Sequence, residues 1–91
     1  MRLVFTEQAF DSLEEILEFL GTTVSYGKLV EIRDRILNKV DTLLIYPFKG
    51  QKEPLLDHLG LEHRRLIEGH YKIIYRVEGE DIYVTDIFDS R

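Results

Sequence analysis

The chain has 91 residues, of which 44% are hydrophobic, and it carries a formal net charge of −5 at pH 7. A chain of this length folds around one core, and an acidic total disfavours a protein that binds nucleic acid through a broad basic surface. The absence of cysteine excludes disulfides, thiolate zinc sites and thiol catalysis. We therefore expect a single domain over residues 1–91, with no metal and no cofactor.

No apolar stretch approaches the ~18 residues that a membrane-spanning helix needs. The N-terminus also lacks the long apolar segment of a signal peptide. We expect a cytoplasmic protein with no membrane partner.

The first twenty residues predict a strand and then a helix. The segment Arg2 to Phe5 is short and apolar, and Thr6 before Glu7 is typical of an N-cap with an acidic first turn. We expect the helix to end at Gly21 in a left-handed conformation. Apolar residues recur at helical spacing between these points: Phe10, Leu13, Ile16, Leu17 and Leu20.

A second helix is expected from Ser25, where Val24 and Leu29 occupy the positions of a hydrophobic staple. Pro47 should stop it. Its apolar stripe consists of Leu29, Ile32, Ile36, Val40 and Leu43. Two amphipathic helices joined by a short turn make a helical hairpin, whose apolar faces must be covered by another element.

Residues 47–60 contain both prolines and have no sustained period. They predict a loop, with one turn of helix at Leu55 to Leu59. From His63 onward the apolar residues alternate with polar ones, which is the pattern of strands.

The alternating segment predicts three strands and their register. A tight turn at Gly79-Glu80 places Val77 opposite Ile82, Tyr75 opposite Val84, Ile73 opposite Asp86, and Tyr71 opposite Phe88. A turn at Gly69-His70 places Leu66 beside Ile73 on the same apolar face. The expected fold is α+β: an N-terminal strand, then a helical hairpin packed on one face of an antiparallel β-sheet.

The opposite face of the sheet is predicted to be uncovered, with cations among aliphatic residues. It collects Arg65, Ile67, Lys72, Ile74, Arg76, Tyr83, Thr85 and Ile87. Two interpretations stay open. Guanidinium groups on a rigid sheet can bind phosphate or carboxylate, or the charges can simply solubilise the wet face of an antiparallel sheet. The exposed isoleucines favour a partner, including a second copy of the chain in a homodimer.

His63 and His70 flank the second of these strands and are candidate general bases beside a phosphate. The alternative is that they are polar loop residues. No pair of histidines has the spacing of a metal site. Asp86 is expected to bond to the backbone or to a nearby arginine, and Ser90 lacks a base that would make it a nucleophile.

The stretch RLIEGHYKIIYRV from Arg65 to Val77, followed by Ile82-Tyr83-Val84 and the terminal IFDSR, resembles the RelE/ParE superfamily. These are toxins of bacterial type II toxin–antitoxin modules, including plasmid stabilisation systems. The shared pattern is an Arg-led strand, a turn, a basic-aliphatic-Tyr strand, an acidic hairpin turn and a last strand ending in Arg. The resemblance covers nearly the whole chain. It implies a growth-inhibiting toxin with a cognate antitoxin as partner.

Two branches of the superfamily imply different activities. RelE-like members cleave messenger RNA on the ribosome with basic and aromatic or His residues of the sheet, and ParE-like members block DNA gyrase without established catalytic residues. By the resemblance, Arg65 matches the first Arg of the RelE-like site and Arg91 the Arg of its final strand. This sequence departs from the RelE-like pattern, however: Ile67 stands in place of a frequent second Arg, Asp89 in place of a frequent His, and no Tyr follows Arg91.

These departures favour the ParE-like branch, because a carboxylate repels the phosphate that a ribonuclease must stabilise. The alternative is a ribosome-dependent mRNA endoribonuclease, in which His63 or His70 would transfer a proton. Such an enzyme would bind phosphate through Arg65, Lys72, Arg76 and Arg91. A third interpretation is an inert relative that binds only the antitoxin or itself.

Overall fold

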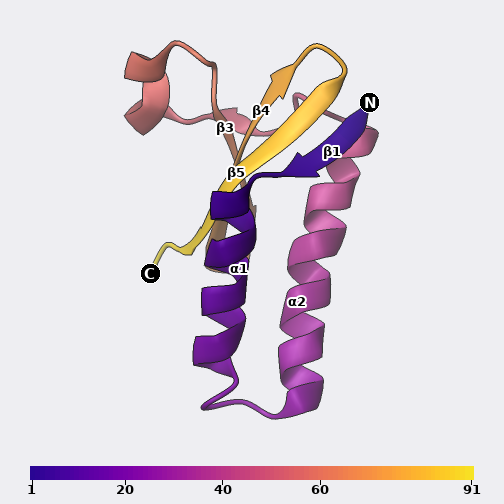
Figure 1. The fold of residues 1–91 in the computed structure, drawn as a ribbon, viewed down its shortest axis with the longest axis vertical. Helices are drawn as coiled ribbons and strands as arrows, with labels where there is room; N and C mark the ends of the chain where they lie inside the picture. The colour runs from indigo at the N-terminus through magenta and orange to yellow at the C-terminus, as the bar shows by residue number, and fades with distance from the viewer.

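The computed structural model describes residues 1–91 as two layers, a helical hairpin and a five-stranded sheet (Figure 1). Helices α1 (Glu7–Leu20) and α2 (Tyr26–Asp41) lie side by side. The strands are β1 (Arg2–Phe5), β2 (Gln51–Lys52), β3 (Arg64–Glu68), β4 (Tyr71–Glu78) and β5 (Asp81–Asp89). Two short 3₁₀ segments, η1 (Thr42–Leu44) and η2 (Pro54–Leu59), join them. The predicted α+β architecture is confirmed.

The strands are arranged in the order β1-β5-β4-β3-β2. All neighbouring pairs are antiparallel except β1 and β5, which run parallel with Leu3 beside Ile82. The sheet is therefore mixed rather than wholly antiparallel, and β2 is a strand that the sequence pattern did not predict.

None of the helices combines the length and the apolar character needed to cross a membrane.

Both helix N-termini begin at the predicted caps. The Thr6 hydroxyl accepts a hydrogen bond from the Ala9 N–H at 3.2 Å, and the Ser25 hydroxyl accepts one from the Lys28 N–H at 3.2 Å. Each cap satisfies one of the N–H groups that a helix start leaves without a partner.

Two predictions for α1 are wrong. Gly21 has a φ of −61° and is not left-handed. The Thr22 hydroxyl donates to the Phe19 carbonyl at 2.7 Å, so a carbonyl at the helix end is satisfied without a left-handed residue. Phe10 is 54% exposed, whereas Ala9 is fully buried. The small Ala9 side chain belongs to the face that meets the sheet, and Phe10 is turned about 100° away from it.

In α2 and η1 the predicted apolar stripe is confirmed, since Ile36, Val40 and Leu43 are buried in the core. The α-helix itself ends at Asp41, earlier than the predicted stop at Pro47. The phasing of β4 is also confirmed, because Tyr71, Ile73 and Tyr75 are buried against the helices.

The two predicted turns are confirmed by the pairs Glu68–Tyr71 and Glu78–Asp81. Gly69 and Gly79 have φ values of 60° and 58°, which glycine adopts more easily than other residues.

The register between β4 and β5 follows the prediction for only half of the hairpin. Val77 pairs with Ile82 and Tyr75 with Val84, but the next pair is Ile74 with Asp86. Thr85 is therefore an extra residue in β5, a β-bulge that reverses the side-chain phase beyond it.

Because of the bulge, the predicted cross-strand partners are wrong for the second half of β5. Ile73 faces Ile87 instead of Asp86, and Tyr71 faces Asp89 instead of Phe88. Ile87, predicted to point away from the helices, is 1% exposed and belongs to the core. The physical reason is that the bulge brings an apolar side chain into a position that regular pairing would give to the Asp86 carboxylate.

The far face of the sheet, opposite the helices, is covered in part by the segment between β2 and β3. The predicted helical turn is present there as the longer η2, which stands apart from both helices in Figure 1. A hollow of about 220 Å³ is lined by Leu55, Leu56, Ile74 and Phe88, among others. Ile74 is only 3% exposed, so the predicted open face is wrong at this position, whereas Ile67 stays 47% exposed.

Candidate functional site

Two of the predicted cations of the far face meet Glu53, a residue that the sequence pattern did not single out. Its backbone N–H donates to the His63 carbonyl at 2.8 Å, so the end of β2 is tied to the chain just before β3. Glu53 as a whole residue is 3% exposed. A carboxylate this deeply buried requires compensating partners.

Two cations predicted for this face supply the compensation. Glu53 Oε2 lies 3.4 Å from Arg65 Nη1 on β3 and 3.6 Å from Lys72 Nζ on β4. Glu53 Oε1 accepts a hydrogen bond from the Leu55 N–H at 3.4 Å. The carboxylate thus bridges two neighbouring strands and the first turn of η2.

Arg65 also holds β2 in place. Its Nη1 donates to the Lys52 carbonyl at 2.9 Å, and its Nη2 donates to Gln51 Oε1 at 3.0 Å. The guanidinium therefore contacts three consecutive residues of the β2 segment through Nη1 and Nη2.

Arg76 and Tyr83 form a second pair on this face. The Arg76 guanidinium carbon lies 4.8 Å from the centre of the Tyr83 ring, on the directly paired strand position, and Arg76 donates to the Glu78 carboxylate. Lys72 lies over the ring of Phe88 at 5.7 Å in the same cross-strand manner. Arg76 and Lys72 therefore each have an acidic partner and an aromatic ring within their own chain.

His63 directly precedes β3 and is 7% exposed. Burial, with a smaller contribution from Arg76, lowers the pKa of its imidazole, which favours the neutral form. Its Nδ1 is buried without a hydrogen-bond partner. The structure places His63 near the Arg76 end of the far face and away from His70.

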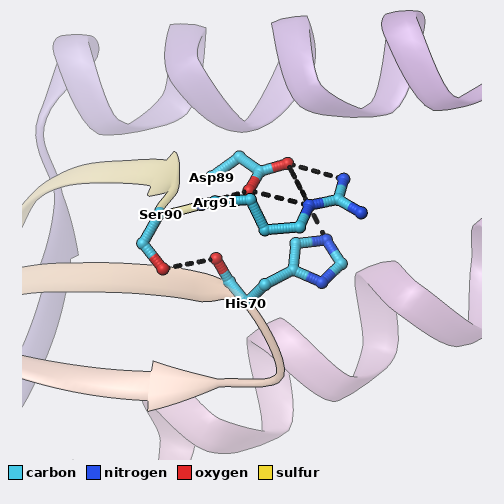
Figure 2. A network of polar contacts seen from close by, with 4 residues as sticks. All are labelled: His70, Asp89, Ser90 and Arg91. Atoms are coloured by element: carbon cyan, nitrogen blue, oxygen red, sulfur yellow. Dashed lines mark hydrogen bonds and ion pairs between the residues drawn. The ribbon is translucent and has the colours of Figure 1, made fainter.

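His70 and Arg91 belong to a separate cluster at the end of β5, shown in Figure 2 with Asp89 and Ser90. The Arg91 guanidinium folds back onto Asp89, with Nη2 2.8 Å from Oδ2, and Asp89 Oδ2 lies 3.8 Å from His70 Nε2. The Ser90 hydroxyl and N–H donate to the His70 carbonyl at 2.8 Å and 2.7 Å. The predicted site residues are thus divided between two places.

Asp89 titrates under the influence of this cluster. Hydrogen bonds from the Arg91 side chain and backbone lower the pKa of its carboxyl from 3.8 to about 2. We expect Arg91→Ala to return the Asp89 pKa toward its ordinary value, and His70→Gln to change it less. Because the folded-state pKa is the lower one, any stability from this pair is present above about pH 4 and is lost as the pH falls toward 2. NMR titration of the side-chain carboxyl carbon measures both variants.

The Asp86 carboxylate accepts a hydrogen bond from the backbone, as expected, and the donor belongs to the next residue of β5. Its Oδ1 accepts from the Ile87 N–H at 2.9 Å and from the Ser12 hydroxyl of α1 at 2.7 Å. Asp86 thus links the bulge of β5 to the first helix.

A larger hollow, about 390 Å³, lies between α1 and the end of β5, with Ile16, Leu20 and the 71% exposed Phe19 in its lining.

The chemistry of these surfaces is dominated by paired charges. On the far face, Arg65 and Lys72 share Glu53, and Arg76 contacts Glu78. At the end of β5, Arg91 is paired with Asp89. Glu53 was missed because it lies in an irregular loop, where no periodicity indicates the direction of a side chain.

Comparison with known proteins identifies the relatives of this chain. The family model described as the ParE toxin of the type II toxin–antitoxin system parDE matches residues 3–91. A solved structure from the chromosomal ParDE toxin–antitoxin system of P. aeruginosa is similar to the chain, with a TM-score of 0.80 and 21% sequence identity. The likeness covers 100% of this chain and 97% of that one. No curated protein gives a significant sequence match.

Proposed function

Because this chain belongs to the ParE toxin family of type II toxin–antitoxin systems, we propose that it inhibits growth in the cytoplasm by binding DNA gyrase. Membership of a family whose members act in toxin–antitoxin pairs implies a cognate antitoxin as a partner. The gyrase target is the part of the proposal that requires an experiment.

The observation that carries the proposal is the internal neutralisation of the sheet cations. A ribonuclease needs cations directed at the phosphate where charge develops in the transition state. Here Arg65 and Lys72 are directed at Glu53, and Arg91 is directed at Asp89. This arrangement favours action through protein contact over phosphate chemistry, in agreement with the formal net charge of −5.

Exposed apolar residues support a protein as the target. Phe19 is 71% exposed beside the hollow between α1 and β5, and Ile45, Tyr46 and Phe48 after α2 are 71%, 64% and 60% exposed. Large aromatic side chains on a surface are typical of protein–protein contacts. The two groups lie on different parts of the chain, since Phe19 is in α1 and the other three residues follow α2.

A supercoiling assay tests the proposal. The purified chain is added to gyrase, relaxed plasmid and ATP, and we expect supercoiling to be lost and then restored by the cognate antitoxin. Expression in cells, with cleavage sites mapped on messenger RNA, provides the comparison. Cleaved messages with normal supercoiling would instead support the RelE-like alternative. Normal growth and normal supercoiling would support the inert relative, and either result would overturn the gyrase proposal.

A further inference from the structure

We propose that the hollow between α1 and the end of β5 binds a segment of a partner protein that carries apolar side chains flanked by lysine or arginine. Three features support this chemistry: the hollow has a partly apolar lining, its rim is acidic, and α1 carries the excess negative charge of the chain. Binding of such a segment does not depend on which protein the chain inhibits.

The apolar part of the hollow consists of side chains that the sheet covers only in part. The buried residues of α1 are Ala9 and Leu13, both in its first half. In its second half Ile16 and Leu20 are partly buried, and Phe19 is 71% exposed. The last turns of α1 extend beyond the end of β5 in Figure 1, so this strand cannot cover them. An apolar surface left exposed beside a hollow is typical of a protein-binding site.

The negative charge of α1 has no partner within the chain. The helix contains five carboxylates and no lysine or arginine, whereas the other residues carry twelve carboxylates and twelve cations. The carboxylates of α1 are those of Glu7, Asp11, Glu14, Glu15 and Glu18. None of them takes part in an ion pair. The field around this helix therefore attracts cations from outside the chain.

This charge is placed beside the hollow. The C-terminus of a helix is stabilised by a cation, but the last turn of α1 has no basic residue and contains Glu18. Glu15, one turn earlier, lines the hollow together with Asp86 and Asp89 of β5. Arg91, the cation of the lining, is already paired with Asp89. A lysine or arginine next to a bound apolar side chain would thus meet uncompensated negative charge.

The test uses two synthetic amphipathic peptides that share one face of leucines and differ only in their charged residues, lysine in the first and glutamate in the second. Each peptide is labelled with a fluorophore and titrated with the unmodified chain, and the anisotropy is measured at low and at high salt. We expect the lysine peptide to bind on the order of tenfold to a hundredfold more tightly at low salt, and the difference to narrow as salt screens the charges. In methyl NMR spectra, the lysine peptide should shift the signals of Ile16 and Leu20.

Two pairs of variants locate the binding at the hollow. Phe19→Ala removes an exposed ring of the lining and should weaken binding of the lysine peptide about tenfold, and Glu15→Gln should weaken it about threefold. Phe10→Ala and Glu7→Gln are the matched controls, because both residues are exposed on the same helix and do not line the hollow. We expect each control to change the affinity less than about twofold. Circular dichroism checks that all four variants are folded.

Equal binding of the two peptides would refute the proposal, as would equal losses of affinity in Phe19→Ala and Phe10→Ala. Methyl shifts confined to residues outside the hollow would place the peptide elsewhere and refute it too. Analytical ultracentrifugation of the chain alone tests another occupant. A dimer that Phe19→Ala converts to a monomer would mean that a second copy fills the hollow in place of a basic segment.

Discussion

Replacing Gly50 with alanine is expected to lower the free energy of unfolding by about 3 kcal/mol, near the upper end of the usual cost of overpacking a core. A Cβ atom at this position would lie 2.6 Å from the Arg65 carbonyl oxygen and 2.7 Å from both Cε1 and the hydroxyl of Tyr75. Atoms cannot approach this closely, so the backbone of β3 or a core side chain would have to move.

Moving either Arg65 or Tyr75 away from Gly50 would cost free energy. Tyr75 is fully buried, and its hydroxyl accepts a hydrogen bond from the Gly50 N–H at 2.9 Å. The Arg65 backbone is part of the β3 ladder, paired with Ile74. Because Gly50 directly precedes β2, the same substitution should also loosen the segment that carries Glu53.

Urea unfolding followed by circular dichroism measures the loss, and Gly27→Ala is the control. Gly27 is exposed in the first turn of α2, and a Cβ atom added there would meet nothing within 4 Å beyond its chain neighbours and the backbone of its own helix. Alanine is favoured over glycine in helices, so this variant should be stabilised by up to about 1 kcal/mol. A Gly50→Ala variant that is as stable as the unmodified chain would show that the close packing around Gly50 does not exist.

The second large effect is expected for Ile87→Ala, which should lower the free energy of unfolding by about 2–5 kcal/mol. Ile87 is 1% exposed and faces the fully buried Ile73 across the β4–β5 hairpin. Truncating it leaves a cavity in the middle of the core, where the surrounding strands and helices can close only in part.

Phe88→Ala is the matched comparison, since it truncates the next residue of the same strand. Phe88 is 39% exposed, and its ring contacts Lys72 on the far face. We expect it to destabilise the protein less than Ile87→Ala, although it removes a larger side chain. Regular pairing without the bulge would bury Phe88 instead of Ile87, so the reverse order of the two effects would refute the register.

The helices and the first half of the β4–β5 hairpin could be predicted from the sequence because their signals are local. Thr6 and Ser25 cap the helices through bonds to N–H groups three residues away. The alternation of Tyr71, Ile73 and Tyr75 directs these side chains to one face whatever the partner strand is. The resemblance over the last third of the chain led to the correct family for the same reason, since that stretch is continuous in sequence.

The bulge at Thr85 could not be predicted from local patterns. Its presence depends on which of Asp86 and Ile87 is buried, and that choice is made by the helices that cover the sheet. Ser12 of α1 supplies a hydrogen bond to Asp86 beside the bulge, from a position 74 residues earlier in the chain. No periodicity within β5 contains this information.

Local patterns were sufficient to predict the class of fold, the two helix starts, the turns at Gly69 and Gly79, and the cations that face away from the helices, because each depends on residues close together in the chain. The partners of these cations depend instead on contacts between distant parts of the chain. Glu53 reaches Arg65 and Lys72 from an irregular segment 12 and 19 residues earlier, and burial of its carboxylate is tolerated only where both cations meet it. Long-range pairing of charges depends on the path of the loop, and that path is set by packing around Gly50 and Tyr75.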